Sequence, residues 1–418
     1  MTIPLYYETF QVGVVEQQGH GPVLLYDPRW RATPEAFPVS LSMPMEQAEH
    51  PTETLLPWLM NLLPEGDPLR TVGSVLGKAP EDVLALLERI GADTAGALSV
   101  GAPRDRERAG YRQVKNQVDL AKIIDGLPAK PFLVDEQGVS MSLAGAQYKL
   151  PIHLADDGTI GVPVYGAPST HILKPDNSRL HGSVANEALC LMLAQRVGLS
   201  TCEVTTGRAG DRTYLIVTRY DRERRRDGRI RRRHQEDFCQ ALGRPPGAKY
   251  EHNQTGWRGP GLATMVDLVR NSLVPGQVPK FLDAVIFNIA VGNVDSHAKN
   301  YSLLYPFDGG PPSLAPLYDL MSGLAWEGVT ENHAQDIGGQ NRGRHIYGRH
   351  WERMARSCGL NATRTRQRVI DTCDRVLDQL QSAADDVTRM PAGDHGMLAV
   401  FVDRIAERAS TVRTNARG

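Results

Sequence analysis

Hydrophobic positions alternate with polar ones near the start of the chain and recur with helical spacing toward its end. Two N-terminal stretches, Tyr6 to Val15 and Pro22 to Tyr26, alternate as strands do, and two more, Thr52 to Leu63 and Glu81 to Ile90, have the spacing of helices. Helical spacing is clearest in residues 363–384 and 397–412. The pattern predicts an α+β protein.

The same pattern divides the chain into three parts. Residues 1–105 form a small α+β domain, 106–240 contain strand-like runs and one helical run, and helical spacing dominates 241–418. A polar stretch, Arg104 to Gly110, marks the first boundary. A length of 418 residues agrees, because it suggests two or three domains.

A polar loop follows an apolar helix in the third part. The predicted helix spans Lys280 to Gly292, and two short strands, 301–305 and 313–317, follow the loop with a turn at Asp308 to Pro312 between them. Helix, loop, hairpin and a carboxylate at the end of the hairpin is the order found in the C-terminal lobe of kinases. This order predicts phosphoryl-transfer residues in the loop.

The loop contains Asp295 and Asn300 with D-x-x-x-x-N spacing, and Asp319 follows nineteen residues after Asn300. In a protein-kinase catalytic loop this Asp accepts the proton of the attacking hydroxyl, and the Asn binds Mg²⁺. Asp319 stands where a second metal-binding carboxylate is expected. The spacing alone is common by chance, so the interpretation needs further residues.

Those residues lie upstream in the expected order. The apolar strand His171 to Pro175 carries Lys174, and a helix that stops at Gly198 begins near Asn186 and Glu187. Kinases also require a lysine on a strand that binds the nucleotide phosphates and a glutamate on a helix that orients this lysine.

A loop of small residues precedes that strand. Residues 142–149, SLAGAQYK, let backbone N–H groups approach phosphate oxygens closely. The loop matches neither G-x-G-x-x-G nor the Walker A pattern, and the Walker-like string at 73–78 is one residue short, so we discard it.

Together these motifs resemble those of the HipA family of serine/threonine kinase toxins. The matching segments run in family order: 61–66 (NLLPEG), 95–98 (AGAL), 142–149, 171–175 (HILKP), 186–187, 219–222 (RYDR), 234–243 (HQEDFCQALG), 249–251 (KYE), 295–300 (DSHAKN) and 316–319 (PLYD). The resemblance implies a two-lobed, protein-kinase-like fold with a small N-terminal α+β domain, a nucleotide-covering lobe over 106–240 and a mostly helical C-terminal lobe.

The resemblance also implies roles for individual residues. Asp295 would be the catalytic base, and Asn300 and Asp319 would be the Mg²⁺ ligands. Lys174 would be the lysine that binds the phosphates of ATP. Other residues would bind ATP or lie beside the nucleotide and metal: Ser142, Ala144, Gly145, Ala146, Gln147, Lys149, Tyr220 at the adenine hinge, His297 and Tyr318.

Ser142 would also be an inhibitory autophosphorylation site. A phosphate there adds nearly two negative charges to a loop that holds the phosphates of ATP, so repulsion should expel the loop.

The family further implies partners and a biological role. The expected substrate is an aminoacyl-tRNA synthetase, most often the glutamyl enzyme, whose phosphorylation arrests translation and growth. The expected partner is a helix-turn-helix antitoxin (HipB-like), which would link the chain to operator DNA only indirectly.

Composition agrees with a cytoplasmic enzyme. No apolar run approaches the ~18 residues of a membrane span, the first 25 residues have no signal-peptide pattern, and we expect no membrane partner. A net charge of −1 gives no bulk attraction to nucleic acid. Five cysteines without a C-x-x-C pair predict buried, reduced thiols rather than disulfides or a zinc site.

Two further groups have less specific interpretations. The arginine-rich segment 222–233 has Asp227-Gly228 at its middle, which predicts an exposed hairpin; it is either a solvated ribbon, which we favour, or a phosphate or RNA contact. His333, His345 and His350 are expected to be surface residues rather than metal ligands.

Two alternatives to a protein kinase remain open. Small-molecule kinases share the Asp/Asn/Asp arrangement, and a nucleotide-sensing corepressor could act only with its antitoxin.

Overall fold

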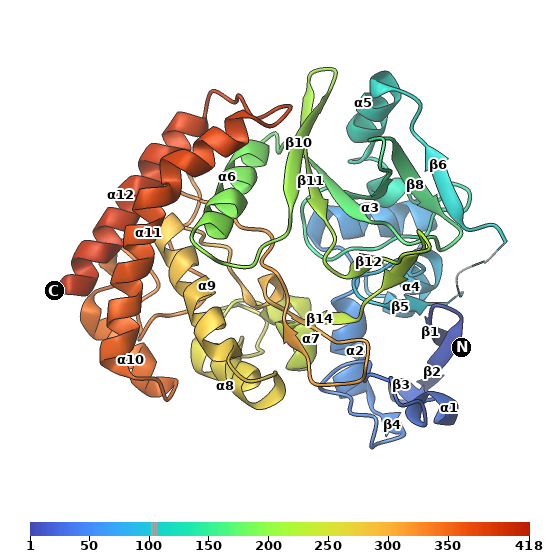
Figure 1. Ribbon diagram of the computed structural model, residues 1–418. Coiled ribbons are helices and arrows are strands. Elements are labelled where there is room, and N and C mark those ends of the chain that lie inside the picture. The colour runs from blue at the N-terminus through green and yellow to red at the C-terminus, as the bar shows by residue number, and fades with distance from the viewer. Residues whose placement is uncertain (102, 104, 106) are drawn as a thin grey trace. The chain divides into compact units, whose positions relative to one another are not determined.

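The computed structural model describes residues 1–101, 103, 105 and 107–418 (Figure 1). These residues form two compact units. Unit 1 comprises Met1–Pro175, Arg208–Pro246 and Leu303–Pro312, and unit 2 comprises Asp176–Gly207, Gly247–Ser302 and Ser313–Gly418. The predicted boundary at 105/106 falls beside Arg104 and Arg106, which lie outside the described residues. The three-part division stays a prediction.

Unit 1 begins with a five-stranded antiparallel sheet in the order β4-β3-β2-β1-β5. Its strands are β1 (Thr2–Tyr7), β2 (Phe10–Gln18), β3 (Gly21–Tyr26), β4 (Glu49–His50) and β5 (Leu98–Val100), and its helices are α1 (Pro28–Arg31), α2 (Thr52–Met60), α3 (Gly66–Leu76) and α4 (Val83–Ile90). The helices predicted at 52–63 and 81–90 are confirmed.

The single strand predicted at Tyr6 to Val15 is wrong. The chain reverses at Glu8 and Thr9, so that Tyr7 pairs with Phe10 in a hairpin. Glu8 has a φ of 54°, which a turn of this tightness requires. No glycine or asparagine marks the turn in the sequence, which is why the alternation looked continuous.

A six-stranded sheet follows in the order β10-β11-β9-β7-β8-β6. Its strands are β6 (Gly110–Gln113), β7 (Leu150–Leu154), β8 (Ile160–Val164), β9 (His171–Pro175), β10 (Val204–Ala209) and β11 (Arg212–Thr218), with α5 (Gln117–Gly126) and a 3₁₀ turn at Pro131–Leu133. The predicted strand at 171–175 is confirmed. Lys174 lies in it, opposite Leu215 of β11.

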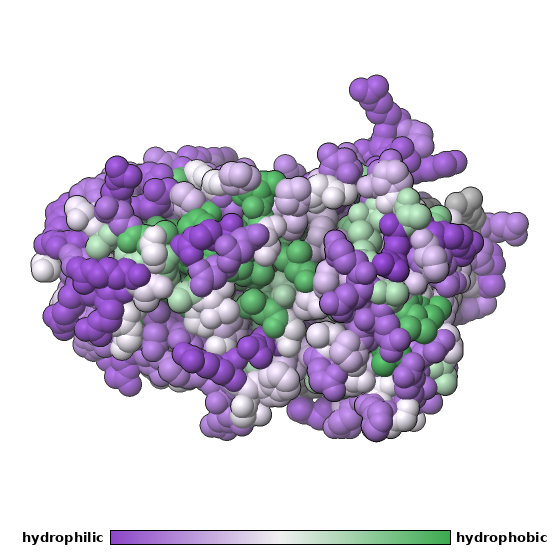
Figure 2. Space-filling view, turned by 90° about the horizontal axis from the view of Figure 1, so that it is seen from below, coloured by the Kyte–Doolittle hydropathy of each residue, from purple (hydrophilic) through white to green (hydrophobic). Residues whose placement is uncertain are grey.

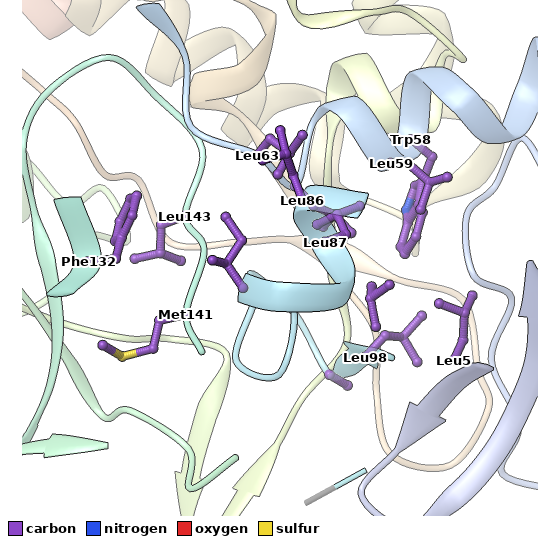
Figure 3. Close-up of a cluster of buried hydrophobic side chains, with 14 of the residues drawn as sticks. Leu5, Trp58, Leu59, Leu63, Leu86, Leu87, Leu98, Phe132, Met141 and Leu143 are labelled. Atoms are coloured by element: carbon purple, nitrogen blue, oxygen red, sulfur yellow. The ribbon is translucent and has the colours of Figure 1, made fainter. Parts of the chain in front are cut away.

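A continuous hydrophobic core joins the N-terminal elements of unit 1 to the segment around Ser142 (Figure 3). Leu5, Trp58 and Leu86 lie in the same cluster as Met141 and Leu143, which flank Ser142. Full burial of one such side chain contributes roughly 1.5–3 kcal/mol. The core therefore anchors the small-residue loop at its first turn.

The arginine-rich segment is a hairpin, as predicted, formed by β12 (Arg222–Arg224) and β13 (Ile230–Arg232) with Gly228 at a φ of 77°. The expectation that its arginines are exposed is wrong for two of them. The side chains of Arg222 and Arg232 are only 2% and 1% exposed, because both pair with Asp93. The sequence around these arginines does not predict their burial, because Asp93 lies more than a hundred residues earlier in the chain.

Unit 2 is mainly helical. Its helices are α6 (Ser183–Arg196), α8 (Leu262–Ser272), α9 (Gln277–Val291), α10 (Gly348–Ser357), α11 (Ala362–Thr388) and α12 (Leu398–Arg417). The long helix α11 packs against α6, α9, α10 and α12, as Figure 1 shows for its red and orange neighbours. The predicted helices at 280–292, 363–384 and 397–412 are confirmed, and α11 and α12 are longer than predicted.

Short elements complete the chain. They are β14 (Gln235–Asp237), α7 (Phe238–Ala241), β15 (Ser302–Leu304), β16 (Ser313–Leu314) and 3₁₀ turns at Pro246–Ala248, Ala298–Asn300 and Gly343–His345. The two predicted strands after the polar loop are therefore present but shorter. Helices and sheets together confirm the α+β class.

The surface and the cysteines add two observations. The face in Figure 2 is largely hydrophilic, with hydrophobic residues in small groups. Among the described residues, no helix combines the length and apolar character needed to cross a bilayer. All five cysteines are buried and free, as expected for reduced thiols.

Candidate active site

The polar loop of unit 2 begins where α9 ends. Gly292 adopts the left-handed conformation that ends the helix, and the next residue, Asn293, shapes the turn with its side chain. The Asn293 carboxamide donates to Asn288 Oδ1 at 2.9 Å and accepts from the backbone N–H of Asp295 at 3.2 Å. Neutral amide groups thus fix the backbone just before Asp295.

Hydrogen bonds close the loop between Asp295 and Asn300. Asn300 Nδ2 donates to the Asp295 carbonyl at 2.8 Å, and the backbone N–H of His297 donates to the same oxygen at 2.8 Å. Asp295 itself is exposed. The loop therefore presents one accessible carboxylate, which suits a base that must reach an external hydroxyl.

Tyr250 is a site residue to which sequence reasoning gave no role. Its hydroxyl donates to Asp295 Oδ1, and its ring packs edge-on against His297 with centroids 5.2 Å apart. The motif Lys249-Tyr250-Glu251 is part of the family resemblance, but no local sequence pattern links Tyr250 to Asp295, 45 residues later in the chain. The contact links Tyr250 directly to the candidate base.

His297 is buried within the loop, 5% exposed. Burial, together with the positive charges of Lys249 and Lys299, holds the pKa of His297 well below its usual value, so the ring is neutral at neutral pH. Its Nδ1 has no hydrogen-bond partner among the described residues. A buried ring nitrogen without a partner is a suitable contact for a bound polar group.

Asp319 follows β16 in a conformation that few non-glycine residues adopt, with a φ of 52°. Tyr318 Oη lies 2.7 Å from the Lys299 carbonyl, to which it donates, and 2.6 Å from Ser302 Oγ. These contacts hold the Asp319 segment beside the Asp295 loop. The negative charge of Asp319 partly offsets the lowering of the His297 pKa, so the two residues lie close enough to interact electrostatically.

The donor set of unit 2 fits a divalent cation. Asn300 uses its NH₂ group within the loop, which leaves Oδ1 as the ligand atom, and Asp319 supplies a carboxylate. Oxygen ligands of this kind suit Mg²⁺, which is usually bound through one or two carboxylates together with substrate phosphates.

The small-residue loop lies in unit 1 and rests on the N-terminal segment 61–66. Ser142 is fully buried, and its Oγ donates to the Leu62 carbonyl at 2.7 Å. The N–H of Glu65 donates to the Gly145 carbonyl at 3.1 Å. Two of the segments that resemble the HipA family, 61–66 and 142–149, are therefore in direct contact.

The middle of this loop is arranged for close approach. Gly145 has a φ of 103°, and a Cβ there would lie 2.9 Å from Lys149 Nζ. Lys149 donates to the Ala144 carbonyl at 2.7 Å, which places its charge at the loop. Ala146 is exposed and Gln147 half-buried. Small residues with an ammonium group at their base can hold phosphate oxygens.

Lys174 and Tyr220 belong to the same unit. Lys174 is 3% exposed in β9, and Tyr220 follows β11, the strand paired with β9. Tyr220 Oη donates to Gln235 Oε1 at 2.7 Å. This hydrogen bond anchors the side chain of Tyr220 at the end of β11.

The residues on both sides of Tyr220 enter a buried ionic cluster, defined here as Asp93, Arg219, Asp221, Arg222 and Arg232. Arg219 binds Asp221 at 2.7 Å, and Asp93 binds Arg222 at 2.9 Å and Arg232 at 3.2 Å. Burial opposes ionisation of Asp93, but the three guanidinium groups outweigh it and hold the pKa of Asp93 well below its usual value. The cluster ties the hinge to the N-terminal segment 93–96.

The predicted site residues thus fall into two groups. Unit 1 holds Ser142, Ala144, Gly145, Ala146, Gln147, Lys149, Lys174 and Tyr220, and unit 2 holds Asp295, His297, Asn300, Tyr318 and Asp319. Each group lies within one unit. The joining of both groups into one site, and the pairing of Lys174 with Glu187, stay predictions.

The expectation of surface positions is wrong for two of the three histidines, His333 and His350. His333 is 4% exposed, and its Nδ1 lies 3.0 Å from the Asn293 carbonyl, so it supports the polar loop rather than the surface. Burial lowers the pKa of His333 to about 3. His350 is also largely buried, whereas His345 is exposed as predicted.

Comparisons with known proteins cover almost the whole chain. Residues 3–101 match the family model of the HipA N-terminal domain, and residues 141–383 match the HipA-like C-terminal domain. The chain is 36% identical over 412 residues to the Y4mE protein of Sinorhizobium fredii, covering 96% of each. It is 30% identical over 332 residues to the serine/threonine-protein kinase toxin HipA of Shewanella oneidensis, covering 75% of this chain and 72% of that one.

A solved structure shows the same fold. The complex of the Shewanella oneidensis toxin–antitoxin system, HipA with HipB and operator DNA, contains a chain that matches 99% of this one over 99% of its own length. The TM-score is 0.85 at 24% sequence identity. The fold class expected from the sequence is therefore confirmed.

Proposed function

Because the chain belongs to the HipA family, we propose that it is an ATP- and Mg²⁺-dependent serine/threonine protein kinase that acts as the toxin of a toxin–antitoxin module. The observation that carries the proposal is the closed Asp295–Asn300 loop, with its exposed carboxylate and the Asp319 segment beside it. Relatives named as kinases, including the Shewanella oneidensis toxin, support it.

The proposed reaction is in-line transfer of the γ-phosphoryl group of ATP. Asp295 accepts the proton of a protein hydroxyl, whose oxygen forms a bond to the γ-phosphorus while the bond to ADP breaks. Tyr250 donates to Oδ1 of Asp295 and so helps to orient the carboxylate. Catalysis by such a site is mainly positioning and charge stabilisation.

Binding roles follow from each group of residues. The 142–149 loop and Lys174 would hold the phosphates of ATP, and the backbone at Tyr220 would bind the adenine. Asn300 and Asp319 would hold Mg²⁺, which supplies positive charge against the transferring phosphoryl group. His297 and Tyr318 would lie beside them.

Autophosphorylation of Ser142 would act as an inhibitory switch. Ser142 is fully buried with its hydroxyl bonded to Leu62, so the loop has to leave segment 61–66 before Ser142 reaches a phosphate donor. A phosphorylated Ser142 could not return, since a buried dianion without a cationic partner is strongly unfavourable.

The proposed substrate is an aminoacyl-tRNA synthetase, with the glutamyl enzyme as first candidate, and its phosphorylation would arrest translation in the cytoplasm. The proposed partner is a HipB-like helix-turn-helix antitoxin, which would carry the chain to operator DNA. The Shewanella oneidensis complex of HipA, HipB and operator DNA supports this assembly.

The test incubates dephosphorylated protein with γ-labelled ATP, Mg²⁺ and a cell lysate, and maps labelled peptides by mass spectrometry. Asp295→Ala is expected to abolish labelling of Ser142 and of a synthetase. Asp403→Ala, an exposed aspartate of α12, is the matched control and should label as the wild type does.

Two outcomes would favour the alternatives. Transfer of label only to a metabolite indicates a small-molecule kinase. ATP binding without any transfer, together with an operator gel-shift that needs this chain but not Asp295, indicates a nucleotide-sensing corepressor.

A further inference from the structure

A buried asparagine of α6 contacts the Asp319 segment. Asn186 is 0% exposed, although an asparagine in a helix interior ordinarily faces solvent. Its Nδ2 donates to the Ser322 carbonyl at 3.2 Å, and its Oδ1 accepts from the Ser322 N–H at 2.8 Å. The carboxamide thus pairs with both backbone groups of one residue, as a neighbouring strand would.

Ser322 is three residues after Asp319. The next residue, Gly323, donates its N–H to the Gly292 carbonyl at 3.0 Å, directly before the polar loop. On the other side of Asp319, Leu317 exchanges backbone hydrogen bonds with Ser200 and Cys202 at 2.8 and 3.0 Å. The segment is therefore held at both ends.

Asp319 needs this support. Its left-handed φ of 52° costs free energy for a non-glycine residue, and such a conformation persists only where the surroundings enforce it. At Ser322 the segment is held by the side chain of Asn186, so a substitution of Asn186 can remove this contact without altering the segment itself.

From this geometry we propose that Asn186 is a positioning residue for metal binding: it holds Ser322 so that the carboxylate of Asp319 stays directed at the cation. The inference deepens the proposed function and rests on it for the role of Asp319. It also couples α6, which carries Glu187, to the metal-binding segment.

The chemistry predicts a specific pattern among variants. Asn186→Ala removes both hydrogen bonds, whereas Ser322→Ala removes a hydroxyl whose Oγ has no partner among the described residues and leaves the paired backbone groups in place. Ser322→Ala is therefore a matched control. Leu193→Ala, fully buried in the same helix, controls for a general loss of stability.

The experiment has two readouts. Electron paramagnetic resonance measures Mn²⁺ affinity in the presence of ADP, and hydrogen exchange measures protection of the Ser322 amide. Asn186→Ala should weaken Mn²⁺ binding about tenfold or more, as loss of a group that orients a ligand typically does, and should speed exchange at Ser322. Both controls should keep the wild-type values.

Each result decides a separate point. A folded Asn186→Ala variant with wild-type Mn²⁺ affinity overturns the inference. If that variant does not fold, Asn186→Asp, which keeps the acceptor for the Ser322 N–H, should show an intermediate loss, and wild-type affinity there overturns it equally. If wild type and Asp319→Ala bind Mn²⁺ alike, the proposed function fails at Asp319, while exchange at Ser322 still reports whether Asn186 holds the segment.

Discussion

The two units hold their candidate loops with different polar groups. In unit 1 the segment around Tyr220 is held by buried charges, Asp93 and Asp221 against three arginines. In unit 2 the loops are held by neutral carboxamides, those of Asn186, Asn288, Asn293 and Asn300.

The difference has a physical reason. Buried ion pairs hold a backbone firmly, but they place fixed charges nearby, and removal of one partner leaves another charge buried. Carboxamides hold a backbone without changing the charge at Asp295 and Asp319, whose own charges the proposed reaction uses. Unit 1 binds nothing through its ionic cluster in this scheme, so fixed charges are tolerable there.

The comparison predicts its largest effect at Asp93. Asp93→Ala removes the buried carboxylate that Arg232 binds at 3.2 Å and leaves Arg222 with Asp221 alone. It should lower the free energy of unfolding by about 3–5 kcal/mol, measured by urea denaturation. Asp125→Ala is the control, because its pair with Arg212 is exposed on both sides, and it should cost less than about 0.5 kcal/mol. Equal effects of the two substitutions would refute the assignment of rigidity to the buried cluster.

A pH-dependent effect is expected at Glu236, a buried carboxyl group of unit 1. Burial raises the pKa of Glu236 from about 4.5 to about 7, although Ser40, Tyr305 and the Leu41 N–H donate to it. The folded state therefore holds a proton that the unfolded state has released. The stability that Glu236 contributes is full below pH 4.5 and is lost as pH rises through 7.

Glu236→Gln should remove this dependence. The difference in unfolding free energy between wild type and variant should change by roughly 3 kcal/mol between pH 4.5 and 8. The wild type should become less stable relative to the variant as pH rises. The buried histidines oppose this trend equally in both proteins, so the difference isolates Glu236. Parallel stability curves would show that Glu236 does not titrate in this range.

The smallest effect on stability is expected at Asn293 in unit 2. Asn293→Ala removes two neutral hydrogen bonds and should cost about 1–2 kcal/mol. Because the backbone N–H of Asp295 loses its acceptor, kcat should fall about tenfold while the Kd for ATP stays near the wild-type value.

Asn415→Ala is the control for Asn293, because its carboxamide also makes a hydrogen bond, donating to the Arg344 carbonyl at 2.9 Å, but from a half-exposed position of α12. It should leave kcat unchanged. A loss at Asn293 as large as that at Asp93 would remove the distinction between charged and neutral support.

Periodic helices and ordered motifs were predictable, whereas contacts between distant side chains were not. The apolar run ending at Gly292 predicted α9, because spacing and a terminal glycine are local signals. The hairpin at Glu8 was missed for lack of a turn residue, and the burial of Arg222, Arg232 and His333 was missed because their partners lie elsewhere in the chain.

The sequence by itself determined the α+β class, the family resemblance and the order of the candidate site residues, because all three depend on residue type and spacing. Tertiary structure alone decided that Ser142 is buried against Leu62, that Tyr250 contacts Asp295 and that Asn186 holds Ser322. The physical reason is that hydrogen bonds act over about 3 Å, whereas these partners are separated by 45 to 136 residues of chain.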